Sequence, residues 1–135
     1  GRPPGALRRR RSMRLLLDTH VLIWWDEGAR MSTRAMEAIR AAEQVYVSAV
    51  TGWEIAIKSS LGRIETSREV ALAVAESGFE ELPVRLSHAE VLRALPWHHR
   101  DPFDRMLVAQ ARSEGLTFVT RDRTLRRYGV KLLPA

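Results

Sequence analysis

The chain has 135 residues, contains no cysteine and carries a formal charge of +6 at pH 7. This length fits one domain that can bury a core without disulfides. The missing cysteines exclude a disulfide framework, a thiolate metal site and thiol redox chemistry, and the composition suits a cytoplasmic protein. Five arginines fall within residues 1–12, which leaves 17 basic and 16 acidic residues elsewhere, so the body of the protein is nearly neutral.

Residues 1–12, GRPPGALRRRRS, form a basic tail without apolar periodicity. We expect this tail to be an extension ahead of a domain that spans residues 13–135; the alternative is an arm that binds RNA. No apolar stretch of the length of a secretory signal follows the arginines before Asp18. The longest uncharged stretch of the domain, residues 44–53, is too short to cross a bilayer as a helix, so no membrane partner is expected.

After Met13, short apolar runs alternate with longer amphipathic segments, which is typical of βα units around a parallel sheet. The consecutive leucines at 15–17 predict a first strand that is covered on both faces. Further strands are expected at residues 45–47, 79–82, 117–119 and, at an edge, 131–133. Helices are expected directly after Asp18 and through residues 21–25, from Ser32 to about 42, and at 49–61, 67–76, 87–95 and 103–112, with Ser48 and Asp101 as N-caps.

Two acids directly follow predicted strands. Asp18 comes after residues 15–17, and Asp122 comes shortly after residues 117–119. Ligands of open α/β sheets bind beyond the carboxyl ends of the strands, so both acids stand where a site is expected. Each also has a structural alternative, since Asp18 could cap the following helix and Asp122 could be a turn residue before a short helix.

Two more acids, Glu54 and Asp104, are expected inside helices and beside apolar stripes. Their apolar neighbours at helical spacing are Val50, Ile57 and Leu61 for Glu54, and Leu107, Val108 and Ala111 for Asp104. Both carboxylates should therefore point toward the sheet, where an isolated charge is costly. The structural alternatives are an i,i+4 pair of Glu54 with Lys58 and a favourable position of Asp104 in the first turn of its helix.

Carboxylates that gather in one place repel one another, and a hard divalent cation removes that conflict. Because cysteine is absent and histidine is scarce, oxygen ligands favour Mg²⁺ or Mn²⁺ over Zn²⁺. Such an ion can activate a water molecule and neutralise charge on a phosphoryl group. The acids therefore predict hydrolysis of phosphodiesters without a nucleophilic serine or cysteine.

Four segments carry a resemblance to a known family: LLLDTHVLIW, SAVTGWEIAIK, RDPFDRMLVAQA and LTFVTRDRTL. In order and spacing they resemble the PIN-domain ribonucleases, and specifically the VapC-like toxins of toxin–antitoxin modules. The resemblance covers nearly all of residues 13–134. It implies a three-layer α/β/α sandwich with a central parallel sheet, a Mg²⁺ or Mn²⁺ site and endonucleolytic cleavage of RNA by metal-activated water.

The resemblance also implies roles for particular residues. Asp18, Glu54 and Asp104 match the three core acids of the family, which bind the metal and are catalytic. Asp122 matches a more variable fourth acid, for which the same metal-binding and catalytic role is expected, and Thr120 matches the hydroxyl that often accompanies it.

The remaining polar and aromatic candidates are given supporting or structural roles. His20 stands where many relatives carry Asn or Ser, and we expect it to support the Asp18 region rather than to act as a base. Asp101 is expected to cap a helix, while His98 and His99 are expected to lie in a solvated loop. Core or dimer packing is favoured over base stacking for most of the tryptophans, which are Trp24, Trp25, Trp53 and Trp97.

Family membership implies a homodimer and a VapB-like antitoxin that presents a basic side chain to the acids. Two other functions stay open. One is a catalytically silent, RNA-binding PIN-domain regulator. The other is a different metal-dependent phosphohydrolase, such as a haloacid-dehalogenase-like phosphatase; that chemistry uses a second Asp two residues after the first, where this chain has His20.

Overall fold

The computed structural model describes residues 13–66 and 68–135, so the expected tail at residues 1–12 lies outside the described residues. Its five strands are β1 (Arg14–Leu17), β2 (Gln44–Ser48), β3 (Glu80–Leu82), β4 (Thr117–Thr120) and β5 (Leu132–Pro134). Its helices are α2 (Thr19–Glu27), α3 (Thr33–Ala41), α4 (Ala49–Ser60), α5 (Val70–Glu76), α6 (Leu86–Ala94) and α7 (Pro102–Glu114), with a 3₁₀ helix η1 (Arg123–Tyr128).

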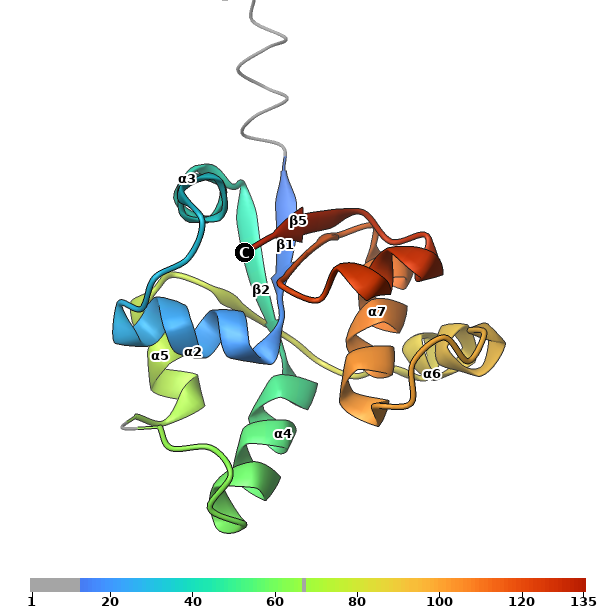
Figure 1. Cartoon of the computed structure of the whole chain (residues 1–135), viewed down its shortest axis with the longest axis horizontal. Helices are drawn as coiled ribbons and strands as arrows, with labels where there is room; N and C mark the ends of the chain where they lie inside the picture. Colours follow the sequence, from blue (N-terminus) through green and yellow to red (C-terminus); the bar gives the residue numbers. More distant parts are fainter. Residues whose placement is uncertain (1–12, 67) are drawn as a thin grey trace, which may run out of the picture.

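The strands form one sheet in the order β3-β2-β1-β4-β5, and every neighbouring pair is parallel. Helices α2, α3 and α5 lie on one side of the sheet, and α6, α7 and η1 lie on the other (Figure 1). Alternate residues of β1 supply the two cores, because Leu15 and Leu17 pack with α2 and α3 while Leu16 packs with α7. The expected three-layer α/β/α sandwich with a parallel sheet is therefore confirmed.

The predicted helix caps that matter for the site are present. Ser48 Oγ accepts a hydrogen bond from Val50 N at the start of α4. Asp101 Oδ1 accepts hydrogen bonds from the backbone of Phe103 and Asp104, and Pro102 occupies the first turn of α7. These caps fix the first residues of α4 and α7, and thereby the positions of Glu54 and Asp104 on the two helices.

Two helix starts differ from the prediction. The helix expected from residue 67 begins at Val70, and residue 67 itself lies outside the described part of the chain. Helix α6 begins at Leu86 without help from Ser87, because the ring of His88 accepts a hydrogen bond from Arg85 N instead. A buried histidine in the first turn of α6 thus satisfies the backbone N–H of the residue before the helix.

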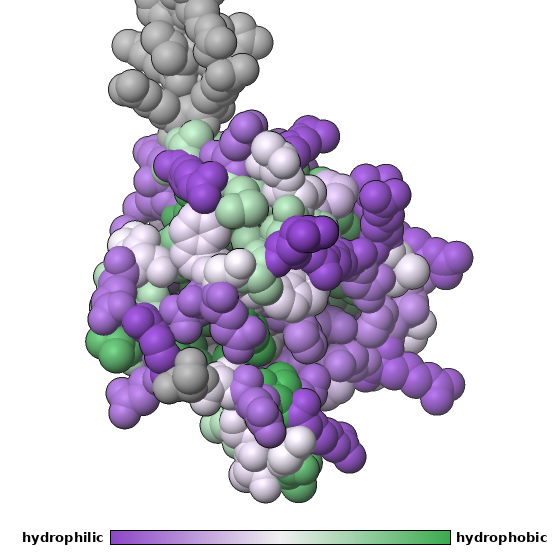
Figure 2. Space-filling model, turned by 60° about the vertical axis from the view of Figure 1, so that its left-hand side comes forward, coloured by the Kyte–Doolittle hydropathy of each residue, from purple (hydrophilic) through white to green (hydrophobic). Residues whose placement is uncertain are grey.

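The face turned forward in Figure 2 carries mostly hydrophilic side chains, with small apolar patches between them. Across the part of the chain that the structure describes, no helix has the length and apolar character needed to cross a membrane.

Candidate active site

Asp18 lies immediately beyond the carboxyl end of β1, and both of its carboxylate oxygens accept hydrogen bonds. Thr19 N donates to Oδ1 at 2.7 Å, and the hydroxyl of Thr120, at the end of β4, donates to Oδ2 at 2.7 Å. Burial raises the pKa of Asp18 even though both hydrogen bonds favour the ionised form. Asp18 therefore caps α2, as its structural alternative predicts, and links the ends of β1 and β4.

Glu54 is 3% exposed and is held from two directions. The hydroxyl of Thr19, which is also buried, donates to Oε1 at 2.7 Å, and Lys58 forms an ion pair with Oε2 one helical turn later. The charge and hydrogen bond of Glu54 raise the pKa of Lys58. The i,i+4 pair considered from the sequence is therefore present, but its carboxylate is buried toward Asp18 and does not lie on a solvated surface.

Asp104 lies in the first turn of α7, and no hydrogen bond reaches its carboxylate from residues 13–66 or 68–135. Its pKa is raised to about 8. Burial is the largest cause, and the negative charges of four neighbouring acids add to it, namely Asp18, Asp101, Glu54 and Asp122. This coupling shows that residues far apart in the sequence bring their charges together around Asp104.

Asp122 follows the carboxyl end of β4 and caps η1. Its Oδ1 accepts hydrogen bonds from the backbone and hydroxyl of Thr124 at 3.0 and 2.5 Å. Its backbone N–H donates to Thr120, whose hydroxyl in turn donates to Asp18. Burial alone would raise the pKa of Asp122, but the hydrogen bonds from Thr124 and the nearby ring of His99 lower it below its ordinary value.

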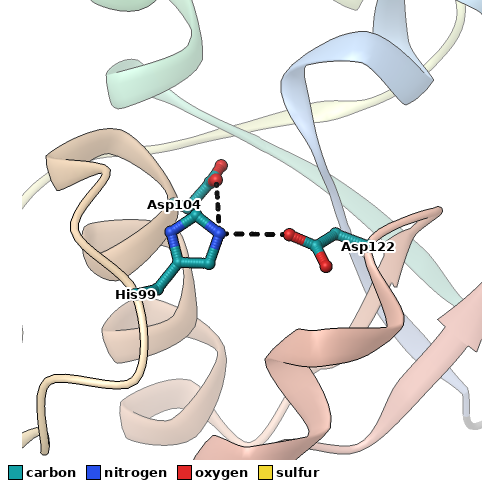
Figure 3. A group of neighbouring side chains, drawn as sticks. All are labelled: His99, Asp104 and Asp122. Carbon is teal, nitrogen blue, oxygen red and sulfur yellow. Dashed lines mark hydrogen bonds and ion pairs between the residues drawn. The ribbon is translucent and has the colours of Figure 1, made fainter.

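His99 points from the loop before α7 to a place between two of these acids (Figure 3). Its Nε2 lies 3.2 Å from Asp122 Oδ2 and 3.8 Å from Asp104 Oδ2. Ligand atoms of these three residues all lie within 4.8 Å of one another, and no other such group of three is found among the described residues.

Comparison with known proteins places this arrangement in a family. Residues 15–131 match the PIN domain. The chain belongs to the PIN-domain family. It is 34% identical over 116 residues to Ribonuclease VapC22 of Mycobacterium tuberculosis, a match that covers 83% of this chain and 89% of that protein.

Solved structures show the same fold. The VapBC2 structure from Rickettsia felis, bound to a DNA fragment from the promoter, matches this PIN domain with a TM-score of 0.69 and 14% identity. A DNA-bound VapBC structure from Salmonella typhimurium matches with a TM-score of 0.67 and 20% identity. Each alignment covers 90% of this chain and 98% of the other.

The residues predicted from the sequence meet at one end of the sheet of this PIN domain, but they are not equally close. Asp18 and Glu54 are bridged by Thr19, and they lie outside the compact group around His99. Thr120 joins Asp18 to the Asp122 turn through two hydrogen bonds, and the supporting role predicted for it is compatible with this position. All four acids therefore belong to one connected region with two subclusters.

Among the histidines, His99 departs from the sequence-based expectation. His20 is exposed and packs its ring 5.9 Å from that of Trp24; it forms no hydrogen bond with Asp18 among the described residues, but its proximity favours the ionised form and acts to lower the pKa of Asp18. His98 is exposed, as expected, whereas the solvated position expected for His99 is wrong. The only sequence signal for His99 is its position two residues before the helix cap Asp101. From this position its ring can accept a hydrogen bond from the backbone N–H of Asp101.

The four tryptophans divide into two that pack against the core and two that are exposed. Trp24 and Trp25 pack against the core on the α2 side, as predicted. Trp53 and Trp97 are 59% and 77% exposed, so neither packs into the core of this chain, and packing in a dimer stays a prediction for them. Trp53 precedes Glu54 and lies against Phe103, which precedes Asp104, so an aromatic pair adjoins both helical acids.

The donor set of this PIN domain fits a hard divalent cation. The candidate ligands are carboxylate oxygens, which Mg²⁺ and Mn²⁺ prefer, and cysteine is absent from the chain. The carboxylate of Asp104 is half-buried, surrounded by negative charge and without a hydrogen-bond donor among the described residues. A cation beside Asp104 would offset that charge, so the site is suited to metal binding.

Proposed function

We propose that this protein is a Mg²⁺- or Mn²⁺-dependent endoribonuclease and that it acts as the toxin of a toxin–antitoxin pair. The observation that carries the proposal is the gathering of acids from separate segments at one end of the sheet. Ligand atoms of Asp104, Asp122 and His99 lie within 4.8 Å of one another, and Thr19 bridges Asp18 to Glu54. The raised pKa of Asp104 agrees with this crowding. A protein gains no stability from such crowding, because like charges in a poorly solvated place disfavour one another. Crowded carboxylates of this kind are typical of functional sites.

In this proposal the role of each acid follows from the hydrogen bonds that its carboxylate already makes. Asp104 would face the ion most directly, since its oxygens are not engaged by other described residues. Asp18 and Glu54, each fixed by threonine hydroxyls, would complete the ligand set or hold its water molecules. Asp122 would orient a water molecule at the edge of the site. The bound ion supplies charge neutralisation at the phosphate and activation of a water for in-line attack.

The names of similar proteins support the substrate and the partner. The relative at 34% identity is named a ribonuclease, which supports RNA as the substrate. Structural neighbours are VapBC and FitAB complexes, which supports an antitoxin partner and a homodimer. A basic antitoxin side chain placed at the acids would compete with the cation and occupy the position of the phosphate.

Cleavage assays with carboxylate variants test the proposal. Asp18→Asn and Asp104→Asn should each abolish Mg²⁺-dependent cleavage of RNA while the circular dichroism spectrum stays unchanged. Glu37→Gln is the matched control, because Glu37 is an exposed acid on α3 beside the amino ends of the strands (Figure 1). Full activity of either Asp variant would refute the metal mechanism.

Assays of RNA binding, RNA cleavage and phosphate release separate the alternative functions. A catalytically silent RNA-binding domain would retain RNA without cutting it at any concentration of Mg²⁺ or Mn²⁺. A phosphatase would release phosphate from small phosphomonoesters and leave RNA chains intact. Expression with and without the product of the neighbouring gene, followed by mapping of RNA ends, would identify both the antitoxin and the target.

A further inference from the structure

The loop that carries His99 is held in place by hydrogen bonds to the hydroxyl of Tyr128. The backbone N–H of His99 donates to the hydroxyl of Tyr128 at 2.8 Å, and Arg105 donates to the same hydroxyl at 3.2 Å. Tyr128 and Arg105 are both buried. Because Tyr128 ends η1 and Asp122 caps its start, one short 3₁₀ helix fixes the backbone of His99 at one end and its side-chain partner at the other.

The ring of His99 has its proton assigned by the surrounding hydrogen bonds. Nδ1 accepts a hydrogen bond from Asp101 N at 3.3 Å, so Nδ1 carries the lone pair and Nε2 carries the proton of the neutral ring. Nε2–H then donates to Asp122 Oδ2 at 3.2 Å. A metal ligand would need the opposite tautomer, in which Nδ1–H would face the backbone N–H of Asp101. The geometry therefore favours a donor over a ligand.

We propose that His99 is a positioning residue of the acidic site, which holds Asp122 through Nε2–H and does not itself bind the metal. The proposal rests on the proposed metal-dependent function. From the sequence, supporting roles are expected for Thr120 and His20 and not for His99.

The charges around His99 explain what this hydrogen bond achieves. Asp122 Oδ1 is already engaged by Thr124, so Oδ2 is the oxygen that receives His99 Nε2–H, and the same Nε2 lies 3.8 Å from Asp104 Oδ2. When Asp104 is ionised the two carboxylates repel one another, and a donor that lies close to both offsets part of that repulsion. In Figure 3 the Nε2 corner of the imidazole ring faces both carboxylates, with dashed lines from this atom to each. His99 thus keeps Oδ2 of Asp122 available at the site, in the way that partners of metal ligands commonly orient them.

Two substitutions separate the donor from the anchor. Glutamine places an N–H donor about as far from the backbone as Nε2 of histidine, so His99→Gln should keep the bond to Asp122. Asparagine reaches only as far as Nδ1, so His99→Asn can still accept from Asp101 N but loses Asp122. His98→Asn is the matched control, since His98 is its exposed neighbour and contacts Tyr128 only by ring packing.

Mn²⁺ binding, followed by electron paramagnetic resonance and calorimetry, gives a readout independent of cleavage. His99→Asn should weaken Mn²⁺ and Mg²⁺ binding by the same factor, about 10- to 100-fold, or lower kcat by that factor at saturating metal with little change in KM. His99→Gln should recover most of the loss, and His98→Asn should match the wild type. Bound Mn²⁺ should show no hyperfine coupling to an imidazole nitrogen.

The opposite results overturn the proposal. Nitrogen coupling to Mn²⁺, or a loss of Mn²⁺ affinity much greater than the loss of Mg²⁺ affinity, would make His99 a metal ligand. Wild-type metal binding and kcat in His99→Asn would give it no role. If the wild-type protein binds Mn²⁺ but cuts no RNA, the proposed ribonuclease function fails, while the binding comparison still decides the role of His99.

Discussion

Metal binding should release a proton from this protein at neutral pH. In the metal-free structure the pKa of Asp104 is about 8, so at pH 7 this carboxyl is roughly nine-tenths protonated. A cation beside it favours the ionised form. Addition of Mg²⁺ or Mn²⁺ at pH 7 should therefore release about 0.9 proton from Asp104. Asp18, whose pKa burial also raises, can only add to that number, whereas Asp122 contributes none because its pKa is lowered.

Calorimetric titration in buffers of low and high ionisation enthalpy measures the number of protons released. The apparent dissociation constant of the metal should increase roughly tenfold for each pH unit below 8 and level off above that pH, because the proton and the cation compete for one carboxylate. The slope of the logarithm of this constant against pH reports the same proton number independently.

Asp104→Asn and Glu37→Gln provide the comparison variants. Asp104→Asn should bind metal weakly and release far less than one proton, and Glu37→Gln should behave as the wild type. If the wild-type protein releases no proton at pH 7, or if Asp104→Asn releases as many protons as the wild type, the reasoning from burial and charge crowding is refuted.

Four further results are expected. Without metal, ionised Asp104 destabilises the fold: as the pH rises from the ordinary pKa of 3.8 to about 8, the folded state binds more protons than the unfolded state and stability falls. In chemical denaturation, the free energy of unfolding of Asp104→Asn should therefore rise relative to that of the wild type by at most about 1.4 kcal/mol per pH unit in that window. A difference in the free energy of unfolding that does not change with pH would contradict the raised pKa. Lys58→Met removes the internal cation of Glu54 and should tighten Mg²⁺ binding about three- to tenfold in calorimetry; unchanged affinity would show that Lys58 does not compete with the metal. Gln110→Leu leaves partners of a buried side chain unpaired and should cost about 1–3 kcal/mol in denaturant unfolding, whereas a neutral effect would mean that water replaces the amide. Deletion of residues 1–12 should leave the rate of RNA cleavage unchanged, and a large loss in a correctly folded protein would identify the tail as an RNA-binding arm.

The layer structure could be predicted because its signals are local and strong. Three consecutive leucines in β1 require cover on both sides of the sheet, and the structure gives each side its own core. The pair Asp101 and Pro102 fixes the first residue of α7 and thereby places Asp104 in its first turn. Such signals depend on neighbours along the chain, so they survive without knowledge of the tertiary structure.

Features that depend on the path of the chain in space were beyond the sequence. His99 reaches the acids only because its loop is tied to Tyr128, which comes 29 residues later. For Leu61 the sequence predicts too much burial. This residue shares a helical face with Glu54 by spacing but is 60% exposed. Helix α4 ends at Ser60, and its last turn extends away from the sheet (Figure 1), so periodicity alone overestimates how far the apolar face is covered.

Structural and functional readings of the acids turn out to be compatible. Asp18 caps α2, Glu54 pairs with Lys58 and Asp122 caps η1, so each of the three has its negative charge partly met by the fold itself. These contacts hold the carboxylates in place before any cation arrives, which lowers the cost of ordering them on binding. Asp104 differs, because its charge is opposed by burial and by its neighbours, and no described residue donates to its carboxylate. The fold thus prepares three acids and leaves the fourth to be neutralised from outside, which is the requirement that a divalent cation or a basic side chain of an antitoxin would each satisfy.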